Sequence, residues 1–527
     1  MRGKLAVLLL VAGLSPAQYD LLIRKGRVID GAGNPWRRAD VAIRGEAIAA
    51  VGLLEGATAA RTIDAAGKAV APGFIDIHTH SRRGILDVPT AENYIRQGVT
   101  TLIEGNDGGS PIPLKPFLDQ VAARRTSVNF ATFAGQGSIR REIIGLVNRP
   151  ATAAEMEQMR NLLRRAMEEG ALGLSTGLFY VPGNYTPTEE VIELAKVAAR
   201  MGGIYISHMR NEADGVLDSV RETIAIGEKA GLPAQITHHK IVGTPNHGRS
   251  AGALRLVEEA RARGVDVTID QYPYTASSTG LTALVPQWAQ EGGQDEMLKR
   301  FRDPATRARI HAAMVDNIRL NRGGGSPKNV VIANCAFDPG LNGKSLAQIT
   351  DERGKPPTFE NAADTALDIL MRGSCQTVYH AIAEPDVERI MKYPWTMIGS
   401  DGEVPVFGRG VLHPRSYGTF ARVLGVYVRE RGILTLEDAV RKMSSFPAAR
   451  LGLNGRGLLA PGMKADLVIF DPAAVADRAV FGNPHQYAVG FSHVVVNGGL
   501  VIDDGKVTDR RPGRVLLGPA AKRPEGP

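Results

Sequence analysis

The sequence predicts an α/β fold: a (β/α)8 TIM barrel with a small β-sandwich domain built from both chain ends. The middle of the chain alternates short apolar strands with amphipathic helices, which is typical of parallel βα units. Both ends contain only strand-like segments. The 527 residues also exceed the roughly 250–300 residues of a single ordinary core, so a barrel with an accessory domain fits the length.

This interpretation divides the chain into five segments. They are a signal peptide (1–17), the first part of the sandwich (18–71), a metal-dependent catalytic barrel (72–454), the second part of the sandwich (455–513) and a loosely held tail (514–527).

The first seventeen residues have the three-part pattern of a secretory signal. A basic start precedes the apolar run Leu5–Leu14, and small residues then lead to Ala17. We expect cleavage near Ala17 and export, to the periplasm or the medium; a buried N-terminal strand is the alternative. The run is shorter than the roughly 20 residues that cross a bilayer, and no later stretch is long and apolar enough, so no membrane span is expected.

The two ends of the remaining chain are predicted to be β-structure. Residues Tyr19–Ile29 alternate polar and apolar side chains, and the turn cluster Asp30–Asn34 follows. Near the other end, 465–472 and 494–502 repeat this pattern. Because chain termini often lie close together, these two blocks are expected to pair.

The middle of the chain is predicted to alternate between strand and helix. The predicted strands are 100–103, 204–207, 235–237 and 265–269, and the predicted helices are 153–169, 187–200, 216–230 and 254–263. In such a barrel, the chemistry lies where the strands end.

Composition excludes several classes of protein. Hydrophobic residues are 43% and charged residues 22%, which excludes a disordered chain. The net charge of +8 comes from basic residues scattered among acids, so it indicates a solvated surface, and no nucleic-acid partner is expected. Only two cysteines, Cys335 and Cys375, are present, which excludes a zinc site of four thiolates and leaves a single disulfide open.

Four predicted strand ends carry side chains of the kind that bind metals. His78 and His80 follow an apolar strand, and because they are two residues apart they can face the same ion. His208, His238 and Asp401 each follow another apolar strand. Each alone could be an ordinary loop residue, but four of only 11 histidines occupy such positions, which favours a metal site.

Longer motifs resemble the amidohydrolase superfamily and, within it, the N-acyl-D-amino-acid deacylases (D-aminoacylases). The resemblance covers nearly all of the chain after residue 17. HPRSYGTF and DQYPYTASST are more specific to this branch than the His-x-His pair. The motifs are PGFIDIHTH at 72–80, QGVTTLIEGND at 97–107, GALGLSTGLFYVPG at 170–183, ISHMRNE at 206–212, THHK at 237–240, DQYPYTASST at 270–279, SDG at 400–402, HPRSYGTFARVLG at 413–425 and PGMKADLVIFDP at 461–472.

The resemblance implies a division of the metal ligands between two sites. His78 and His80 correspond to the more exposed site, and His208 and His238 to the tighter one. Asp401 corresponds to the general base and acid, close enough to the metal to ligate it. His239 is the rival of His238, although the family spacing puts the ligand two residues before a lysine.

The resemblance also implies a clamp for the substrate carboxylate. Arginine provides a fork of donors and lysine supplements it. The corresponding residues are Lys240, Tyr272, Ser278 and Arg415.

This chain departs from the family pattern in two places. The family motif GNCG supplies a cysteine ligand, but here Asp107 occupies that position. A carboxylate can also ligate zinc and can bridge two ions; the alternative is that Asp107 only forms a turn, with Glu104 as a substitute ligand. Arg82 and Arg83 replace the acids that usually follow His80, so the charge at the pocket rim differs.

These features together indicate a metal-dependent hydrolysis of N-acyl-D-amino acids to a carboxylate and a free D-amino acid. The expected cofactor is Zn2+, as one or two ions, for which Mn2+ or Co2+ can substitute. A related amidohydrolase that cleaves dipeptides or cyclic amides is the alternative, and a non-catalytic binding protein is disfavoured by the intact ligand set.

Ser175 lies in a G-x-S-x-G pattern, but no helix can start after it, so it is not expected to be a nucleophile. The oligomeric state stays open.

Overall fold

The computed structural model describes residues 18–522. The predicted signal peptide at 1–17 therefore lies outside the described residues. Within 18–522, no helix is both long and apolar enough to cross a membrane.

The centre of the molecule is a parallel barrel, as predicted. One set of paired strands runs in the order β6-β7-β8 and the other in the order β17-β13-β12-β11-β10-β9, with β8 and β9 consecutive along the chain. A parallel bridge between Thr79 and Gly402 brings the first strand against the last. The strands are β6 (Phe74–Asp76), β7 (Val99–Glu104), β8 (Asn129–Thr132), β9 (Ala134–Gly135), β10 (Gly173–Gly177), β11 (Ile204–His208), β12 (Ala234–Ile236), β13 (Val267–Gln271) and β17 (Thr396–Ile398).

Amphipathic helices cover the outside of this barrel. Helix α6 has the predicted bounds and buries one face through residues such as Val220 and Ile224; it ends at Gly231, whose φ of 70° is the left-handed conformation that glycine adopts easily. The covering helices are α1 (Glu92–Ile95), α2 (Lys115–Arg124), α3 (Gln136–Ile143), α4 (Ala153–Glu168), α5 (Thr188–Arg200), α6 (Val216–Ala230), α7 (Ser250–Ala262), α12 (Glu384–Lys392), α13 (Arg415–Arg422), α14 (Leu436–Met443) and α15 (Ser445–Arg450).

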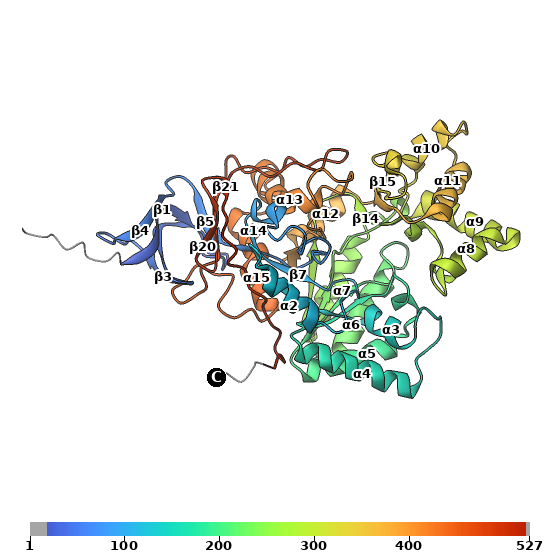
Figure 1. The fold of residues 1–527 in the computed structure, drawn as a ribbon, viewed down its shortest axis with the longest axis horizontal. Helices are drawn as coiled ribbons and strands as arrows, with labels where there is room; N and C mark the ends of the chain where they lie inside the picture. The colour runs from blue at the N-terminus through green and yellow to red at the C-terminus, as the bar shows by residue number, and fades with distance from the viewer. Residues whose placement is uncertain (1–17, 523–527) are drawn as a thin grey trace, which may run out of the picture.

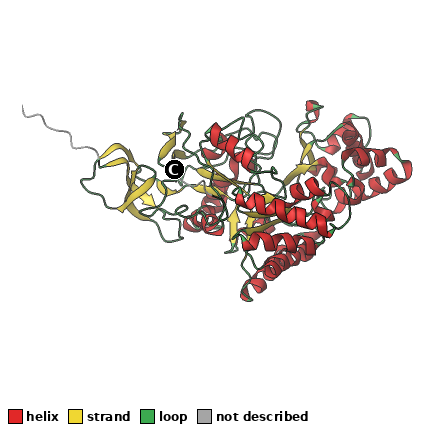
Figure 2. Cartoon of the chain, turned by 60° about the horizontal axis from the view of Figure 1, so that its bottom comes forward, coloured by secondary structure: helices red, strands yellow, loops and turns green. Residues whose placement is uncertain are grey.

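The two chain ends build one β domain, as predicted. Strand β5 from the N-terminal block pairs antiparallel with β18 from the C-terminal block, and the resulting nine-stranded sheet has a core of its own. Strands and loops make up this end of the molecule, whereas helices cover the rest (Figure 2). Its strands are β1 (Tyr19–Val28), β2 (Arg37–Arg44), β3 (Ala47–Gly52), β4 (Ala59–Asp64), β5 (Ala69–Pro72), β18 (Leu467–Phe470), β19 (Phe491–Val496), β20 (Gly499–Asp503) and β21 (Lys506–Val507).

An insertion between β13 and β17 forms a separate lobe at the opposite end from the β domain (Figure 1). It has its own hydrophobic core, and a disulfide joins Cys335 to Cys375. The sequence predicted only that the barrel carries insertions, without this arrangement. The lobe contains β14 (Ser277–Gly280), α8 (Gln294–Arg302), α9 (Pro304–Leu320), β15 (Val330–Asn334), α10 (Leu346–Glu352), α11 (Phe359–Arg372) and β16 (Gln376–Tyr379).

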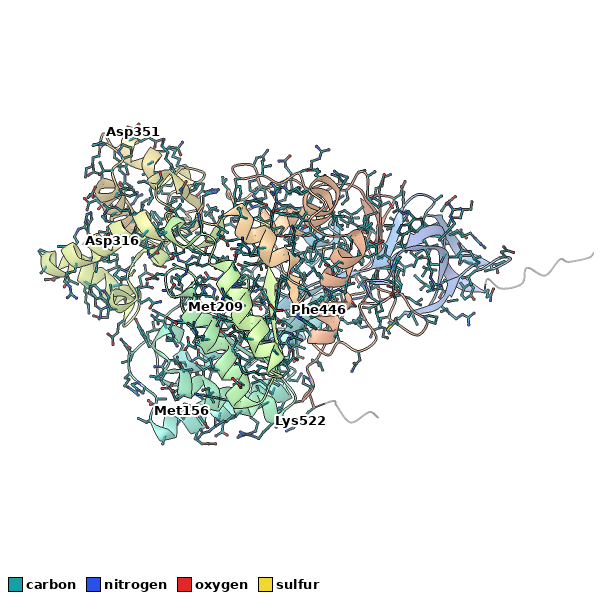
Figure 3. All side chains as sticks on the ribbon, turned by 180° about the vertical axis from the view of Figure 1, so that it is seen from behind. Met156, Met209, Asp316, Asp351, Phe446 and Lys522 are labelled. Carbon is teal, nitrogen blue, oxygen red and sulfur yellow. A yellow bond between two sulfur atoms is a disulfide. The ribbon has the colours of Figure 1, made fainter. Side chains whose placement is uncertain are left out.

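The C-terminal segment is more firmly held than the predicted loose tail. Phe130 of β8 exchanges backbone hydrogen bonds with Arg514 and Leu516, and Lys522 donates its backbone N–H to Glu168 of α4. Figure 3 shows Lys522 at the end of the described chain near α4, far from Asp316 and Asp351 in the insertion. Residues 514–522 therefore pack along the barrel, because their backbone groups find partners there.

Candidate active site

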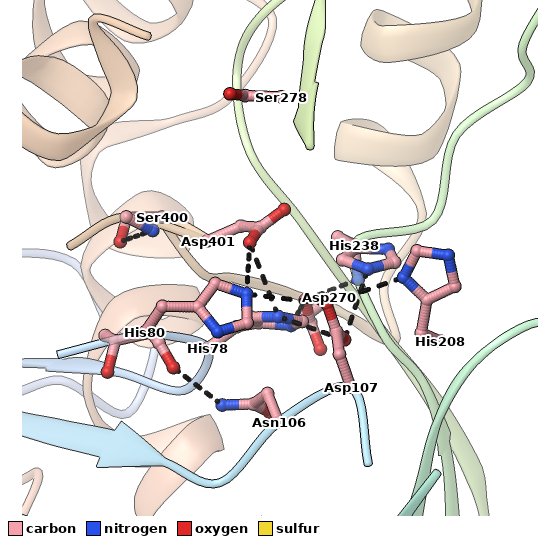
Figure 4. A network of polar contacts seen from close by, with 12 residues as sticks. His78, His80, Asn106, Asp107, His208, His238, Asp270, Ser278, Ser400 and Asp401 are labelled. Atoms are coloured by element: carbon pink, nitrogen blue, oxygen red, sulfur yellow. Dashed lines mark hydrogen bonds and ion pairs between the residues drawn. The ribbon is translucent and has the colours of Figure 1, made fainter. Parts of the chain in front are cut away.

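The predicted metal-binding side chains all lie at the carboxyl ends of barrel strands. His78 and His80 follow β6, Asp107 follows β7 and His208 ends β11. His238 and Asp401 follow β12 and β17 in the same way. Because the carboxyl ends of parallel strands meet at one edge of a barrel, the fold brings all six side chains together (Figure 4).

Asp107 lies between two groups of ligand-type atoms. Its Oδ1 is 3.5 Å from His78 Nε2 and 3.3 Å from His238 Nε2. Its Oδ2 is 3.4 Å from both His80 Nε2 and His208 Nδ1. One group is therefore His78, His80, Asp107 and Asp401, the other is Asp107, His208 and His238, and the Asp107 carboxylate belongs to both.

These separations fit metal ions. Ligand atoms about 2.1 Å from one ion in a tetrahedron lie about 3.4 Å from each other, close to the measured distances. Both ring nitrogens of His78 and of His208, and Oδ1 of Asp107, are buried without a hydrogen-bond partner among the described residues. Buried polar atoms without partners are costly, and a bound ion would satisfy them. The residues present thus suit one or two divalent cations.

Three of these residues have an unusual backbone conformation. Asp107, His238 and Asp401 have φ values of 56°, 33° and 52°, in the left-handed region that non-glycine residues seldom adopt. Such strain persists where the surrounding structure over-determines it, which is common at functional sites.

The electrostatics divide the histidines of this cluster. Despite burial, neighbouring carboxylates raise the pKa of His80 to about 9 and the pKa of His238 to about 10, so a bound cation would have to displace a proton from each. Burial lowers the pKa of His208 to about 4, so its imidazole is neutral near pH 7. Burial opposes ionisation of Asp107, but His238, His78 and His208 hold the pKa of its carboxyl well below its usual range. Neutral imidazole and ionised carboxylate are the states that bind metals.

Two buried aspartates orient this cluster. Asp270 accepts a hydrogen bond from the backbone N–H of His238 at 2.7 Å, and its Oδ1 is 3.4 Å from His78 Nδ1. Asp76 accepts from the backbone N–H of Ser400 at 2.8 Å, and burial raises its pKa to about 7. These hydrogen bonds hold the backbone of His238 and of Ser400, and the Asp270 carboxylate beside the ring of His78 is placed to orient that histidine. Asp270 opens the DQYPYTASST motif, but its orienting role was not predicted.

The two rival ligands lie outside the cluster. His239 is buried on the far side of the strand end, where neither ring nitrogen has a partner among the described residues. Glu104 accepts a hydrogen bond from the backbone N–H of Arg82 at 2.8 Å. Neither belongs to the groups that could hold an ion within residues 18–522.

The cluster opens into a cavity of about 490 Å³ that contains most of the predicted carboxylate clamp. Lys240, Ser278 and Arg415 line the cavity. Arg415 Nη1 is 2.7 Å from Asp401 Oδ2, whereas the other oxygen of Asp401 is 3.0 Å from His80 Nε2.

Tyr272 lies beside the cavity and does not line it. Its ring centroid is 5.6 Å from Lys240 Nζ and 4.9 Å from Arg415 Cζ, so it packs against both cations.

Arg82 and Arg83 both line the cavity at its rim. Arg83 forms an ion pair of 2.7 Å with Glu403.

Ser175 is a structural residue, as the sequence indicates. It is fully buried within β10 and accepts a hydrogen bond from the backbone N–H of Gly108 at 2.9 Å. It therefore supports the turn that carries Asp107.

Sequence reasoning missed two buried charged residues of the cavity. Glu212 is 3% exposed and Arg322 is 5% exposed, and both side chains face the cavity. Glu212 ends the ISHMRNE motif, so a carboxylate four residues after His208 was a visible signal. Arg322 belongs to no quoted motif, because it reaches the site only through the fold of the insertion.

Comparisons with known proteins agree with this geometry. Residues 61–502 match the amidohydrolase family. The chain is 39% identical to the D-aminoacylase of Alcaligenes xylosoxydans xylosoxydans, over 95% of this chain and 98% of that protein. It is 38% identical to the N-acyl-D-glutamate deacylase of the same organism, over 95% and 96%. The chain also superposes on the crystal structure of N-acyl-D-glutamate deacylase from Bordetella bronchiseptica, with a TM-score of 0.79 and 35% identity. The match covers 95% of this chain and 99% of that chain. That structure is a complex with zinc and a phosphonate mimic of the tetrahedral intermediate.

Proposed function

The chain belongs to the amidohydrolase family, as an enzyme of the D-aminoacylase type that hydrolyses N-acyl-D-amino acids, and we propose that it does so with zinc. The proposed ligands are His78, His80, Asp107, His208, His238 and Asp401. The observation that carries this proposal is the shared Asp107 carboxylate, which lies 3.3–3.5 Å from four imidazole nitrogens. The zinc complex of the Bordetella bronchiseptica relative also supports it.

In the proposed mechanism Asp401 moves the proton. Zinc at these ligands would polarise the scissile carbonyl and increase the acidity of water. Asp401 takes the proton of the attacking water and passes it to the leaving nitrogen. Its position suits this role, because one carboxylate oxygen faces the imidazoles and the other faces Arg415 and the cavity.

Lys240 and Arg415 are the proposed anchors of the substrate α-carboxylate. Both are cations that line the cavity, and the ring of Tyr272 packs against both of them. With the carboxylate held at one end of the cavity and the amide held where zinc would bind, the two enantiomers differ only in the exchange of the side chain and the hydrogen on the α-carbon. Selection of the D configuration then follows if the cavity wall admits the side chain in only one of these two positions.

A metal count on the purified protein, together with a screen of N-acetyl-D- and N-acetyl-L-amino acids, tests this proposal. We expect one or two zinc ions per chain and cleavage of the D substrates only. Mn2+ or Co2+ should restore activity after chelation. Cleavage of dipeptides or cyclic amides in place of N-acetyl-D-amino acids would contradict the assigned reaction.

Arg415→Ala is expected mainly to raise KM and to weaken the preference for D over L substrates. The variant removes a fork of donors for the α-carboxylate, and charged hydrogen bonds of this kind contribute about 10- to 100-fold in affinity. The measurement is kcat and KM on both enantiomers, with Arg83→Ala, at the rim of the same cavity, as the matched control. If the native enzyme cleaves amidated substrates equally well, the carboxylate clamp is wrong.

We also propose that the protein is exported after cleavage near Ala17. The Cys335–Cys375 disulfide supports export, because disulfides persist mainly in oxidising compartments. We expect the exported protein to begin at Gln18 and to show no free thiol after denaturation without reductant. An uncleaved N-terminus in a cytosolic fraction with two free thiols would contradict this proposal.

A further inference from the structure

A second cavity adjoins the active-site cavity. Its volume is about 410 Å³, and it lies between the loop after α3 and the insertion. Arg141 of α3 and Val181, in the loop after β10, line both cavities. We call this second cavity the side pocket. Because the two cavities share part of their wall, a ligand in the active site can extend into the side pocket.

The side pocket is far less polar than the active-site cavity. Arg141, at the junction, is the one charged residue of its wall within residues 18–522. Apolar side chains come from Leu146, Val181, Met297 and Leu370. The active-site cavity carries the proposed metal ligands and several arginines. A wall of this composition favours a hydrocarbon group over a charged one, because apolar surface gains free energy when it leaves water.

Backbone contacts hold the two walls of the side pocket together. The carbonyl of Leu146, in the loop after α3, accepts the backbone N–H of Gly292 in the insertion at 3.0 Å. Two residues later, the backbone N–H of Asn148 donates to Glu291 Oε1 at 3.0 Å. Gly293 has a φ of 85°, and a Cβ there would lie 2.7 Å from Leu146 Cδ1, so the walls also touch. The side pocket is therefore a preformed part of the fold.

The barrel places the side pocket across from the proposed carboxylate anchors. In the closed ring of strands β10 lies across from β17, and the anchors Lys240 and Arg415 follow β12 and β17. The proposed zinc ligands come from β6 and β7 on one flank of this line and from β11 and β12 on the other, so zinc would lie between the two sides. A substrate with its carboxylate at the anchors and its amide at zinc then directs its acyl group towards β10. Its side chain branches from the α-carbon, next to the carboxylate.

We infer that the side pocket binds the acyl group of the substrate, and that the preferred substrates carry an unbranched aliphatic acyl chain longer than acetyl. This inference rests on the proposed function, which places the amide at zinc and the carboxylate at Lys240 and Arg415. Hydrolysis breaks the amide C–N bond, adds the hydroxyl of water to the acyl carbon and a proton to the nitrogen, and so releases a fatty acid and a free D-amino acid. Each methylene that leaves water contributes about fourfold in affinity.

A series of acyl chains on one amino acid tests the inference. The substrates are N-acetyl-, N-butanoyl- and N-hexanoyl-D-leucine, and the measurement is kcat/KM. Full burial of the four additional methylenes of hexanoyl corresponds to about 200-fold. Because Leu146 is only half-buried, part of the chain stays in contact with water, and we expect kcat/KM to be about 10- to 100-fold higher for hexanoyl than for acetyl. N-acetyl-D-norleucine and N-acetyl-D-2-aminooctanoate form a second series, in which the side chain lengthens instead.

A variant of Leu146 locates the preference. Leu146→Trp fills the side pocket and should bring the hexanoyl-to-acetyl ratio of kcat/KM close to one, without changing the ratio in the side-chain series. Val147→Trp is the matched control. Val147 is the next residue, is 43% exposed and does not line the side pocket, so both ratios should stay at their native values.

Three outcomes would overturn the inference. A kcat/KM that is flat or falls from acetyl to hexanoyl in the native enzyme contradicts it even if Leu146→Trp does not fold. A hexanoyl preference that survives in folded Leu146→Trp contradicts it, and so does a loss confined to the side-chain series, which would assign the side pocket to the side chain. In all three cases N-acetyl-D-leucine is still cleaved, so the assigned reaction stands. Failure to cleave any N-acyl-D-amino acid contradicts the proposed function itself.

Discussion

Asp401→Asn is expected to retain the metal and to lose at least about 10²-fold in kcat, the usual effect of removing a general base. The amide of asparagine has nearly the shape of the carboxylate but cannot accept the proton of the attacking water. Asp401 is the carboxylate that faces both the imidazoles and the cavity, with one oxygen 3.0 Å from His80 Nε2. The measurements are kcat on an N-acetyl-D-amino acid and metal content by mass spectrometry.

Glu403→Gln is the control for Asp401→Asn. Glu403 lines the same cavity two residues later, but it pairs with Arg83 at the rim and contacts none of the proposed metal ligands. We expect its kcat to stay within about threefold of the native value, as for surface substitutions of little energetic effect. Near-normal turnover in Asp401→Asn would exclude it as the base.

The sequence predicted those parts of the site that lie at strand ends. Strands such as β11 and β12 are short apolar runs, and the polar residue that follows each one stands out in the sequence. Because all parallel strands of a barrel end at one edge, His208 and His238 could be expected to meet without knowledge of their packing. The same argument extended to His78 and Asp401, which the structure brings into the cluster.

The residues that surround the proposed metal ligands could not be identified from the sequence in this way. Asp270 lies within a buried strand, where a carboxylate has no periodic pattern to identify it, and its role depends on contacts with His78 and His238. Arg322 lies about 80 residues from the nearest ligand, His238, and meets the site because the insertion packs over the barrel. Such long-range contacts depend on tertiary structure, which local sequence patterns do not contain.

The position of the C-terminal segment and the strand pairing within the insertion also depend on tertiary contacts. The segment 514–522 has no strong strand pattern, yet its backbone pairs with β8 and packs Leu516 against the barrel. Cys335 and Cys375 are 40 residues apart, and only the pairing of β15 with β16 brings them together. The antiparallel sheet of the insertion was missed because its strands alternate with helices, just as the barrel strands do.

Asp107 differs from the cysteine of the family motif, and it is expected to set the metal preference of this enzyme. A thiolate strongly favours zinc, whereas a carboxylate is a harder ligand that favours Mn2+ and Mg2+ relatively more. Asp107→Ala should lose metal and activity together, because both proposed sites share this carboxylate. Asp107→Cys should keep activity and bind zinc more tightly. Metal content by mass spectrometry after dialysis against a chelator, with activity in Zn2+, Mn2+ and Co2+, measures these effects.

Glu104 provides the matched control for Asp107. It is a buried carboxylate three residues earlier, but it accepts the backbone N–H of Arg82 and its pairing partner at 3.8 Å is the side chain of Arg82. Glu104→Ala should therefore keep its metal, and Glu104→Gln, which preserves the shape, separates any loss of folding from a loss of ligation. Full metal retention in Asp107→Ala would reduce Asp107 to a turn residue, and metal loss in both Glu104 variants would transfer the ligand role to Glu104. The left-handed φ of 56° at Asp107 argues for ligation. If the position only had to form a turn, glycine would adopt this φ with less backbone strain.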